Sequence, residues 1–263
     1  MPPAFFLLTD FGLQDPYAGQ MKAALWSRMP QAQVLDLSHG VRPHNVLQAA
    51  FFLASSWPYL PPGSTGLAVV DPGVGTERSI LLAREGGKSV LTPDNGLLGL
   101  LLQSRSECRL WRMQPPTPEQ EISSTFHGRD VFAPLACELA QGIHPDQLGI
   151  EITLSECSQL PLTRPNREGS RIQTVVIHVD HFGNCVLNLP AAEWSQSMLA
   201  SPHLSVLHPR KETVYPVSTY ARLADNQLGI LIGSQGYLEL ACNQGSCARK
   251  LGLDIGDKCT FGL

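Results

Sequence analysis

The sequence has no block of like charges. Its 23 acidic and 19 basic residues are mixed along the 263-residue chain and leave a formal net charge of −4. A protein that binds nucleic acid through the phosphate backbone needs a basic stripe or patch, and none is present. We therefore expect no nucleic-acid partner. With 43% hydrophobic and 16% charged residues, the composition is typical of a compact globular protein and not of a disordered one.

Long hydrophobic runs are also missing. The run 97–102 (LLGLLL) is far shorter than the ~20 residues that a helix needs to cross a membrane. The apolar run 4–8 (AFFLL) has no basic leader and is soon followed by Asp10, which is not the pattern of a secretory signal. We expect a soluble protein that is not exported and has no membrane partner.

The seven cysteines include no C-x-x-C pair and lie scattered along the chain. An odd, scattered set favours neither a disulfide framework nor a zinc site. We expect reduced thiols that mostly pack as small hydrophobic side chains, and a cytoplasmic location. They are Cys108, Cys137, Cys157, Cys185, Cys242, Cys247 and Cys259.

The signatures of several common sites are absent. The glycines of 71–75 (DPGVG) belong to no G-x-x-x-x-G-K-[ST] or G-x-G-x-x-G motif, so a nucleotide-phosphate site has little support. A tight turn and a close backbone approach to a ligand both explain them. No G-x-S-x-G elbow indicates a serine hydrolase. His178, Asp180 and His181 lie too close together in a strand-like segment to point to one side, so we expect no metal site.

The first part of the chain alternates short apolar runs with segments of helical periodicity. This alternation predicts an α/β sheet with helices on its faces. The predicted strands are 4–10, 33–38, 65–71, 79–83 and 89–94, and the predicted helices are 17–29, 45–60 and one that opens at 95.

The character of the sequence changes after Gly142. The polar, proline-bearing segment 159–170 is typical of a surface connection, and we place the boundary near 164–170, between domains 1–165 and 170–263. Short strands separated by Gly, Asn, Pro and Asp predict a small β-barrel or sandwich in the second domain. These strands are 172–180, 185–190, 204–208, 228–233, 237–242 and 258–263.

Three aspartates end apolar runs of the first domain. Asp10, Asp71 and Asp94 each precede a turn that contains glycine. Ligands of open α/β sheets gather at the carboxyl ends of the strands. Further on, His127 stands at the start of a predicted helix, where the helix dipole favours a neutral imidazole. It is a base, a water-orienting group or a capping residue. Asp180, at the end of another apolar strand, suits a polar contact to a ligand.

Several ordered motifs resemble one family over nearly the whole chain. They are LLTDFGLQDPYAGQMKAAL (7–25), VVDPGVGTERSI (69–80), TPDNGLL (92–98), FHGRDVFAPLACELA (126–140), HVDHFGN (178–184) and GSQGYLELACNQGSCARKLGLDIGD (233–257). The family is that of the S-adenosyl-L-methionine (SAM) hydroxide adenosyltransferases, or SAM hydrolases, which are related to the fluorinases and chlorinases.

The resemblance implies an N-terminal Rossmann-like α/β domain and a C-terminal small β-barrel domain. It also implies a homotrimer whose sites lie between the N-terminal domain of one subunit and the C-terminal domain of the next. The implied reaction is the hydrolysis of SAM to adenosine and L-methionine, without a cofactor. The implied catalytic residues are Asp71, Arg78 and His127.

The same resemblance implies substrate contacts at matching positions. Asp10 would hold the ribose hydroxyls, Asp15 and Asp180 the methionine ammonium, and Ser234 its carboxylate. Adenine and ribose would be held by Phe126, Phe182, Asn184 and the backbone near Asn243 and Gln244.

Two other functions stay open at this point. The first is halide transfer to give a 5′-halo-5′-deoxyadenosine. The halogenases carry hydroxyl side chains near the halide, where this sequence has Val74 and Gly128, and a tyrosine where it has Asp71, which favours the hydrolase branch. The second is a non-catalytic module that binds adenosine or SAM.

Overall fold

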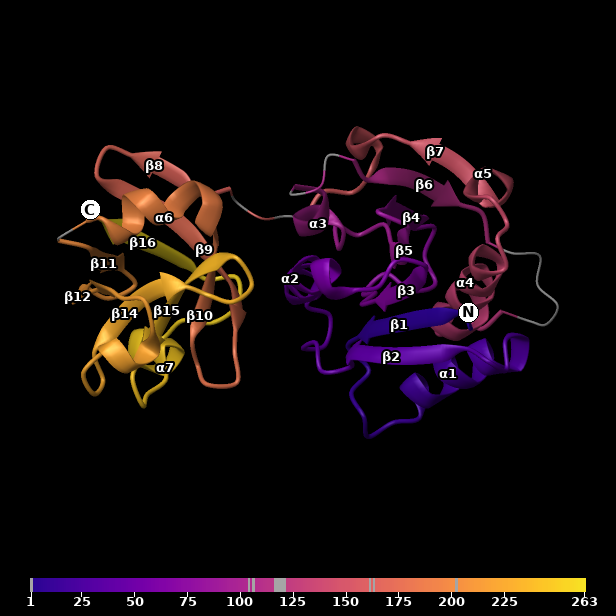
Figure 1. Ribbon diagram of the computed structural model, residues 1–263, viewed down its shortest axis with the longest axis horizontal. Helices are drawn as coiled ribbons and strands as arrows, with labels where there is room; N and C mark the ends of the chain where they lie inside the picture. The colour runs from indigo at the N-terminus through magenta and orange to yellow at the C-terminus, as the bar shows by residue number, and fades with distance from the viewer. Residues whose placement is uncertain are drawn as a thin grey trace. The chain divides into compact units, whose positions relative to one another are not determined.

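The computed structural model describes residues 2–103, 105, 107–115, 122–160, 162, 164–201 and 203–263. The chain divides into two compact units, Met1–Pro161 and Leu162–Leu263, and each is described by itself. The fold is mixed α/β with two large sheets, one of which is nearly barrel-shaped (Figure 1).

The N-terminal unit contains a seven-stranded sheet in the order β2-β1-β3-β5-β4-β6-β7. The first four strands of this order are parallel, whereas β4, β6 and β7 join as antiparallel strands. The sheet is therefore mixed. Its strands are β1 (Ala4–Thr9), β2 (Gln33–Ser38), β3 (Ser64–Val69), β4 (Ile80–Glu85), β5 (Lys88–Pro93), β6 (Arg109–Met113) and β7 (Gly149–Ile152).

Two hydrophobic clusters pack on the sheet of the N-terminal unit. Successive side chains of a strand point to opposite faces, and Phe5 and Phe6 accordingly belong to different clusters. Phe6 packs with Trp57, and Phe5 with Met21 and Phe132. The helices are α1 (Tyr17–Arg28), α2 (Val46–Ser56), α3 (Gly99–Gln103), α4 (Ala133–Ala140) and α5 (Pro145–Leu148), with short turns η1 (Trp57–Tyr59), η2 (Gly128–Phe132, a π-helix) and η3 (Leu154–Glu156).

The C-terminal unit is built on a nine-stranded sheet around one hydrophobic cluster that includes Val176, Leu187, Leu240 and Phe261. Short helices and turns cover it: α6 (Ala191–Leu199), α7 (Cys247–Leu251) and η4 (Tyr220–Arg222). The strands are β8 (Asn166–Glu168), β9 (Arg171–Val179), β10 (Cys185–Pro190), β11 (Ser205–His208), β12 (Glu212–Thr213), β13 (Tyr215–Pro216), β14 (Leu228–Ile232), β15 (Tyr237–Cys242) and β16 (Lys258–Gly262).

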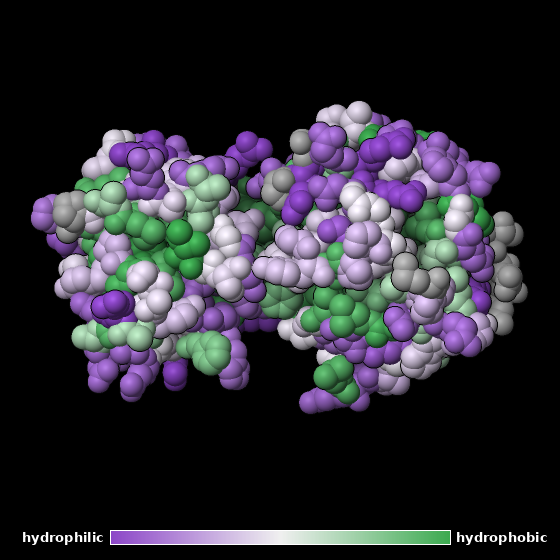
Figure 2. All heavy atoms as spheres, viewed as in Figure 1, coloured by the Kyte–Doolittle hydropathy of each residue, from purple (hydrophilic) through white to green (hydrophobic). Residues whose placement is uncertain are grey.

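The cysteines are unpaired and mostly buried, and the visible surface is largely hydrophilic. All seven cysteines are unpaired, and all but the half-buried Cys108 are buried. Figure 2 shows hydrophilic residues over much of the visible face of each unit, with smaller groups of hydrophobic residues between them. Within the described ranges, no helix has both the length and the apolar character that crossing a bilayer requires.

Candidate functional site

A loop of residues 71–78, called here the 71–78 loop, joins β3 to β4. The sheet order places β5 between these strands. Because β4 is antiparallel to β5 and pairs Ile80 with Pro93, β4 begins at the edge where the parallel strands β3 and β5 end. The chain therefore leaves the sheet before Asp71 and re-enters it after Arg78 at the same edge. This is the edge where the sequence predicted a site.

Asp71 and Arg78 form a buried ion pair within the 71–78 loop. Arg78 Nε donates to Asp71 Oδ2 over 2.7 Å, and Arg78 Nη2 lies 2.5 Å from the same oxygen. The two side chains are only 10% and 5% exposed, for Arg78 and Asp71 respectively. Among the described residues, the other oxygen, Asp71 Oδ1, is buried and has no hydrogen-bond partner. A buried acceptor without a partner is uncommon and points to a functional role or a bound water.

The same guanidinium contacts His127, from a segment distant in the sequence. Arg78 Nη2 lies 3.1 Å from His127 Nδ1. Arg78 Cζ lies over the ring of Phe132, 5.6 Å from the ring centroid. A guanidinium only donates hydrogen bonds, so Nδ1 is the acceptor and the neutral imidazole carries its proton on Nε2. The structure therefore brings together Asp71, Arg78 and His127, as the resemblance implied.

Burial lowers the pKa of His127, and the positive charge of Arg78 lowers it further, against the opposing charges of Asp71 and Asp130. His127 stands immediately before the π-helix η2 without a side-chain capping bond. A lowered pKa favours the neutral imidazole at neutral pH, and its causes are burial and the Arg78 charge, whereas the sequence argument rested on the helix dipole.

We expect His127 to titrate below the ordinary histidine pKa of about 6.5. Arg78→Leu removes the nearby cation and leaves the Asp71 carboxylate, so the midpoint should rise. The ring-proton resonances of His127, assigned with a His127→Asn variant, measure this by NMR. A wild-type midpoint at or above 6.5, or no rise in Arg78→Leu, would contradict the tautomer and the contact described above.

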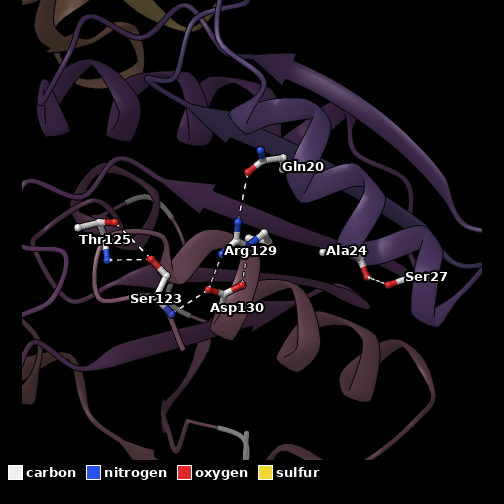
Figure 3. Close-up of polar contacts among 7 residues, drawn as sticks. All are labelled: Gln20, Ala24, Ser27, Ser123, Thr125, Arg129 and Asp130. Carbon is white, nitrogen blue, oxygen red and sulfur yellow. Dashed lines mark hydrogen bonds and ion pairs between the residues drawn. The ribbon is translucent and has the colours of Figure 1, made fainter. Parts of the chain in front are cut away.

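Polar contacts fix the segment that carries His127 (Figure 3). The Ser123 amide donates to Asp130 Oδ2 over 3.0 Å, and Arg129 Nε donates to Asp130 Oδ1 over 2.6 Å. Arg129 Nη1 also reaches Gln20 Oε1 on α1 over 3.3 Å. These bonds fasten residues 123–130 to one another and to a helix of the same unit.

The 71–78 loop and residues 123–130 meet at Gly75. Its φ is +81°, and an added Cβ would lie 2.6 Å from the Ser124 carbonyl oxygen. Only glycine combines that backbone conformation with such a close approach. The sequence left two interpretations of the glycines in 71–75, a tight turn and a close approach to a ligand. In the structure, Gly75 allows the 71–78 loop and residues 123–130 to pack together.

The remaining predicted residues of the N-terminal unit lie around the same strand ends or beside α1. Asp10 follows β1 and its Oδ2 accepts a hydrogen bond from the His44 amide over 2.8 Å. Phe126 is buried in a ring cluster with Phe11 and Tyr17. Asp15 is exposed just before α1.

The C-terminal unit has a cavity of its own, with a volume of about 670 Å³. It brings together every substrate contact that the sequence predicted on this unit, from β-strand ends and turns far apart in the chain. These residues are Asp180, Phe182, Asn184, Ser234, Asn243 and Gln244. Phe182 is 76% exposed, an unusual state for an aromatic side chain, whereas Asn184 is 5% exposed.

Two further polar residues of this cavity were missed in the sequence. Tyr220 and Glu239 line it, and the Tyr220 hydroxyl donates to Glu239 Oε1. Glu239 is 7% exposed. The available signal was a carboxylate inside the apolar run 237–242 (YLELAC), because buried carboxylates are rare unless they have a partner. Within the described part of the chain, no group of three or more His, Cys, Asp or Glu side chains is arranged to hold a metal ion.

The architecture and these two groups of residues define a two-domain α/β protein. A carboxylate–guanidinium–imidazole set lies on one unit, and the other has a cavity that contains several polar side chains. Sequence profiles identify its relatives. The profile of the SAM hydroxide adenosyltransferase N-terminal domain matches residues 5–149, and that of the C-terminal domain matches residues 174–260. The chain belongs to the SAM hydroxide adenosyltransferase family.

Individual relatives agree with this assignment. A Thermus thermophilus protein named (R)-S-adenosyl-L-methionine hydrolase is 36% identical over 264 residues, which cover 97% of this chain and 98% of the relative. A protein of Actinoplanes sp. named fluorinase is more distant, at 24% identity over 97% of this chain and 95% of the relative. A crystal structure from Thermotoga maritima has a TM-score of 0.88 at 27% identity, over 99% of this chain and 100% of that one.

Proposed function

We propose that this protein hydrolyses SAM to adenosine and L-methionine. The observation that carries the proposal is the buried Oδ1 of Asp71, which has no hydrogen-bond partner among the described residues and lies next to a guanidinium that also contacts His127. Membership of the family and similarity to a protein named as a SAM hydrolase support it.

The proposed reaction is a single displacement at C5′. The water oxygen forms a bond to C5′ while the bond from C5′ to sulfur breaks, and its electron pair goes to sulfur. The leaving group is the neutral thioether of methionine, so it needs no acid. The water loses one proton, and the site must accept that proton and align the oxygen with the carbon.

Each member of the set has a distinct proposed role. Asp71 Oδ1 accepts the proton, because it is the carboxylate oxygen to which no residue in the described ranges donates a hydrogen bond. Arg78 orients the carboxylate through its contacts with Oδ2. His127 has its Nδ1 engaged by Arg78, so the Nε2 proton is free to donate to the water oxygen and to fix its position. This division makes Asp71, and not His127, the proposed base.

We also propose the implied substrate contacts and assembly. Ribose would be bound by Asp10, the methionine ammonium by Asp15 and Asp180, and its carboxylate by Ser234. The adenosyl group would be bound by the remaining predicted residues, Phe126, Phe182, Asn184, Asn243 and Gln244. These residues are divided between the two units, so a site that uses all of them needs both kinds of domain. The homotrimer whose sites are shared by neighbouring subunits is proposed from the family resemblance.

Two finer assignments stay predictions. The Rossmann-like description of the N-terminal unit rests on the parallel strands β2, β1, β3 and β5. The cytoplasmic location rests on the unpaired cysteines.

The test is to incubate the purified protein with SAM in H₂¹⁸O and to analyse the products by chromatography and mass spectrometry. We expect adenosine that carries ¹⁸O at the 5′ position, in equal amount to L-methionine. A parallel incubation with chloride or fluoride would give a 5′-halo-5′-deoxyadenosine if the protein were a halogenase. Tight adenosine binding without any turnover would instead make it a binding module, and either result would reject the proposed hydrolysis.

A further inference from the structure

The cavity of the C-terminal unit contains a carboxylate with one oxygen engaged and one oxygen available. Glu239 lies on β15 and is only 7% exposed. Its Oε1 accepts a hydrogen bond from the hydroxyl of Tyr220, on η4. Among the described residues, Oε2 has no hydrogen-bond partner, and it lies so close to Gly233 that a Cβ there would be 2.5 Å away. Oε2 is therefore positioned beside the turn that begins at Gly233.

Asp180, the predicted ammonium contact, is engaged differently. Its Oδ1 accepts from the amides of Phe182 and Asn184 over 2.9 and 2.8 Å. Its Oδ2 accepts from Asn184 Nδ2 over 2.9 Å. These bonds close the turn 180–184, so much of the hydrogen-bonding capacity of Asp180 already holds its own loop. Of the two carboxylates, Glu239 has the oxygen that lacks any such bond.

The two carboxylates lie in one cavity, and Asp180 contributes to the pKa of Glu239. Burial raises the pKa of Glu239, and the charge of Asp180 raises it further, although the hydrogen bond from Tyr220 acts in the opposite direction. Arg249 also lines the cavity, but within the described residues no lysine or arginine forms an ion pair with either carboxylate. The buried Glu239 carboxylate and the half-buried Asp180 carboxylate have the same charge and share one cavity without an ion-pair partner, which is unfavourable, so the cavity suits a ligand group that carries a positive charge.

We propose that Glu239, positioned by Tyr220, accepts a hydrogen bond from the α-ammonium group of the methionyl part of the substrate and of the product L-methionine. The inference rests on the proposed function. Glu239 Oε2 is next to Gly233, and the neighbouring Ser234 is the predicted carboxylate contact. Ammonium and carboxylate share one carbon in methionine, so their contacts must be neighbours. A neutral amino group of adenine would leave both negative charges uncompensated.

In the experiment, the full chain is first saturated with adenosine. It is then titrated in a calorimeter with L-methionine and, separately, with 4-(methylthio)butanoate, which lacks the ammonium group. The wild type should bind L-methionine about tenfold more tightly or better, because hydrogen bonds to charged groups are the strong ones. Glu239→Gln should lose about tenfold in affinity for L-methionine and leave 4-(methylthio)butanoate unchanged. Tyr220→Phe should lose affinity for L-methionine alone, by a smaller factor.

Glu168→Gln is the matched control, because Glu168 is an exposed carboxylate of the same unit, on β8. It should bind all ligands as the wild type does, and adenosine affinity reports whether each variant keeps the cavity intact. The inference would be overturned if Glu239→Gln lost affinity equally for L-methionine and 4-(methylthio)butanoate, or lost none for L-methionine. It would also be overturned if the wild type bound the two ligands with equal affinity. Failure of the proposed hydrolysis would appear separately, as wild-type protein that forms no adenosine from SAM.

Discussion

Asp71→Asn is expected to lower the rate of adenosine formation from SAM by about a thousandfold or more. The substitution keeps the shape of the side chain but removes the carboxylate that is proposed to accept the proton from water, and a positioned base contributes about 10²–10⁴-fold. It also leaves the guanidinium of Arg78, which is 10% exposed, without its charged partner. Both effects act in the same direction on the chemical step.

Single-turnover chromatography of adenosine measures the rate, and thermal unfolding measures the cost of breaking the ion pair. Removal of one partner of a buried pair costs about 3–5 kcal/mol, of which the neutral amide of Asn can recover part. Glu77→Gln is the control, because Glu77 is an exposed carboxylate next to Arg78 in the same loop. It should retain wild-type turnover. Equal turnover in Asp71→Asn and wild type, with a folded variant, would exclude Asp71 as the base.

Gly75→Ala is expected to lower the free energy of unfolding by about 2–4 kcal/mol. The estimate combines the cost of a positive φ in a residue other than glycine with that of forcing a methyl group into an occupied space. The new Cβ would meet the Ser124 carbonyl oxygen at 2.6 Å, so the 71–78 loop must separate from residues 123–130. The contact of Arg78 with His127 would then lengthen, and turnover should fall together with stability.

Denaturant unfolding, followed by circular dichroism, measures this change, and Gly142→Ala separates its two causes. Gly142 has a φ of +91°, but nothing lies within 4 Å of an added Cβ. Its substitution should therefore cost only the conformational part, about 1 kcal/mol, and leave turnover unchanged. If Gly75→Ala destabilised the protein no more than Gly142→Ala does, the close packing of the two segments would be refuted.

The predicted strands were recovered well because their signal is local. Apolar runs such as 4–10 and 65–71 became β1 and β3, since a strand buried on both faces reads as a continuous hydrophobic run. The direction of β4 carries no such local signal, and the mixed sheet follows from its antiparallel pairing with β5. Helix α6 was missed although Ala191 and Met198, which lie two turns apart on the same helical face, are both buried.

The candidate site was predictable only in part. The ends of the apolar runs located Asp10 and Asp71 by general rules for α/β sheets. The partnership of Arg78 with His127 spans 49 positions, and no periodicity links residues that far apart, so it came from the resemblance. Glu239 had one local signal, a carboxylate inside the apolar run 237–242, but its partner Tyr220 lies outside that run and came from the structure.

The path of the 71–78 loop has a consequence for how the protein works. The loop leaves β3, passes the end of β5 and enters β4, so both of its ends are built into one continuous sheet. Its charged side chains are thereby arranged when the chain folds, and little reorganisation is left for each catalytic cycle. Crystals grown with and without a nucleoside should show the same loop path, and selectivity among sulfonium compounds would then arise in the turns of the C-terminal unit that line its cavity.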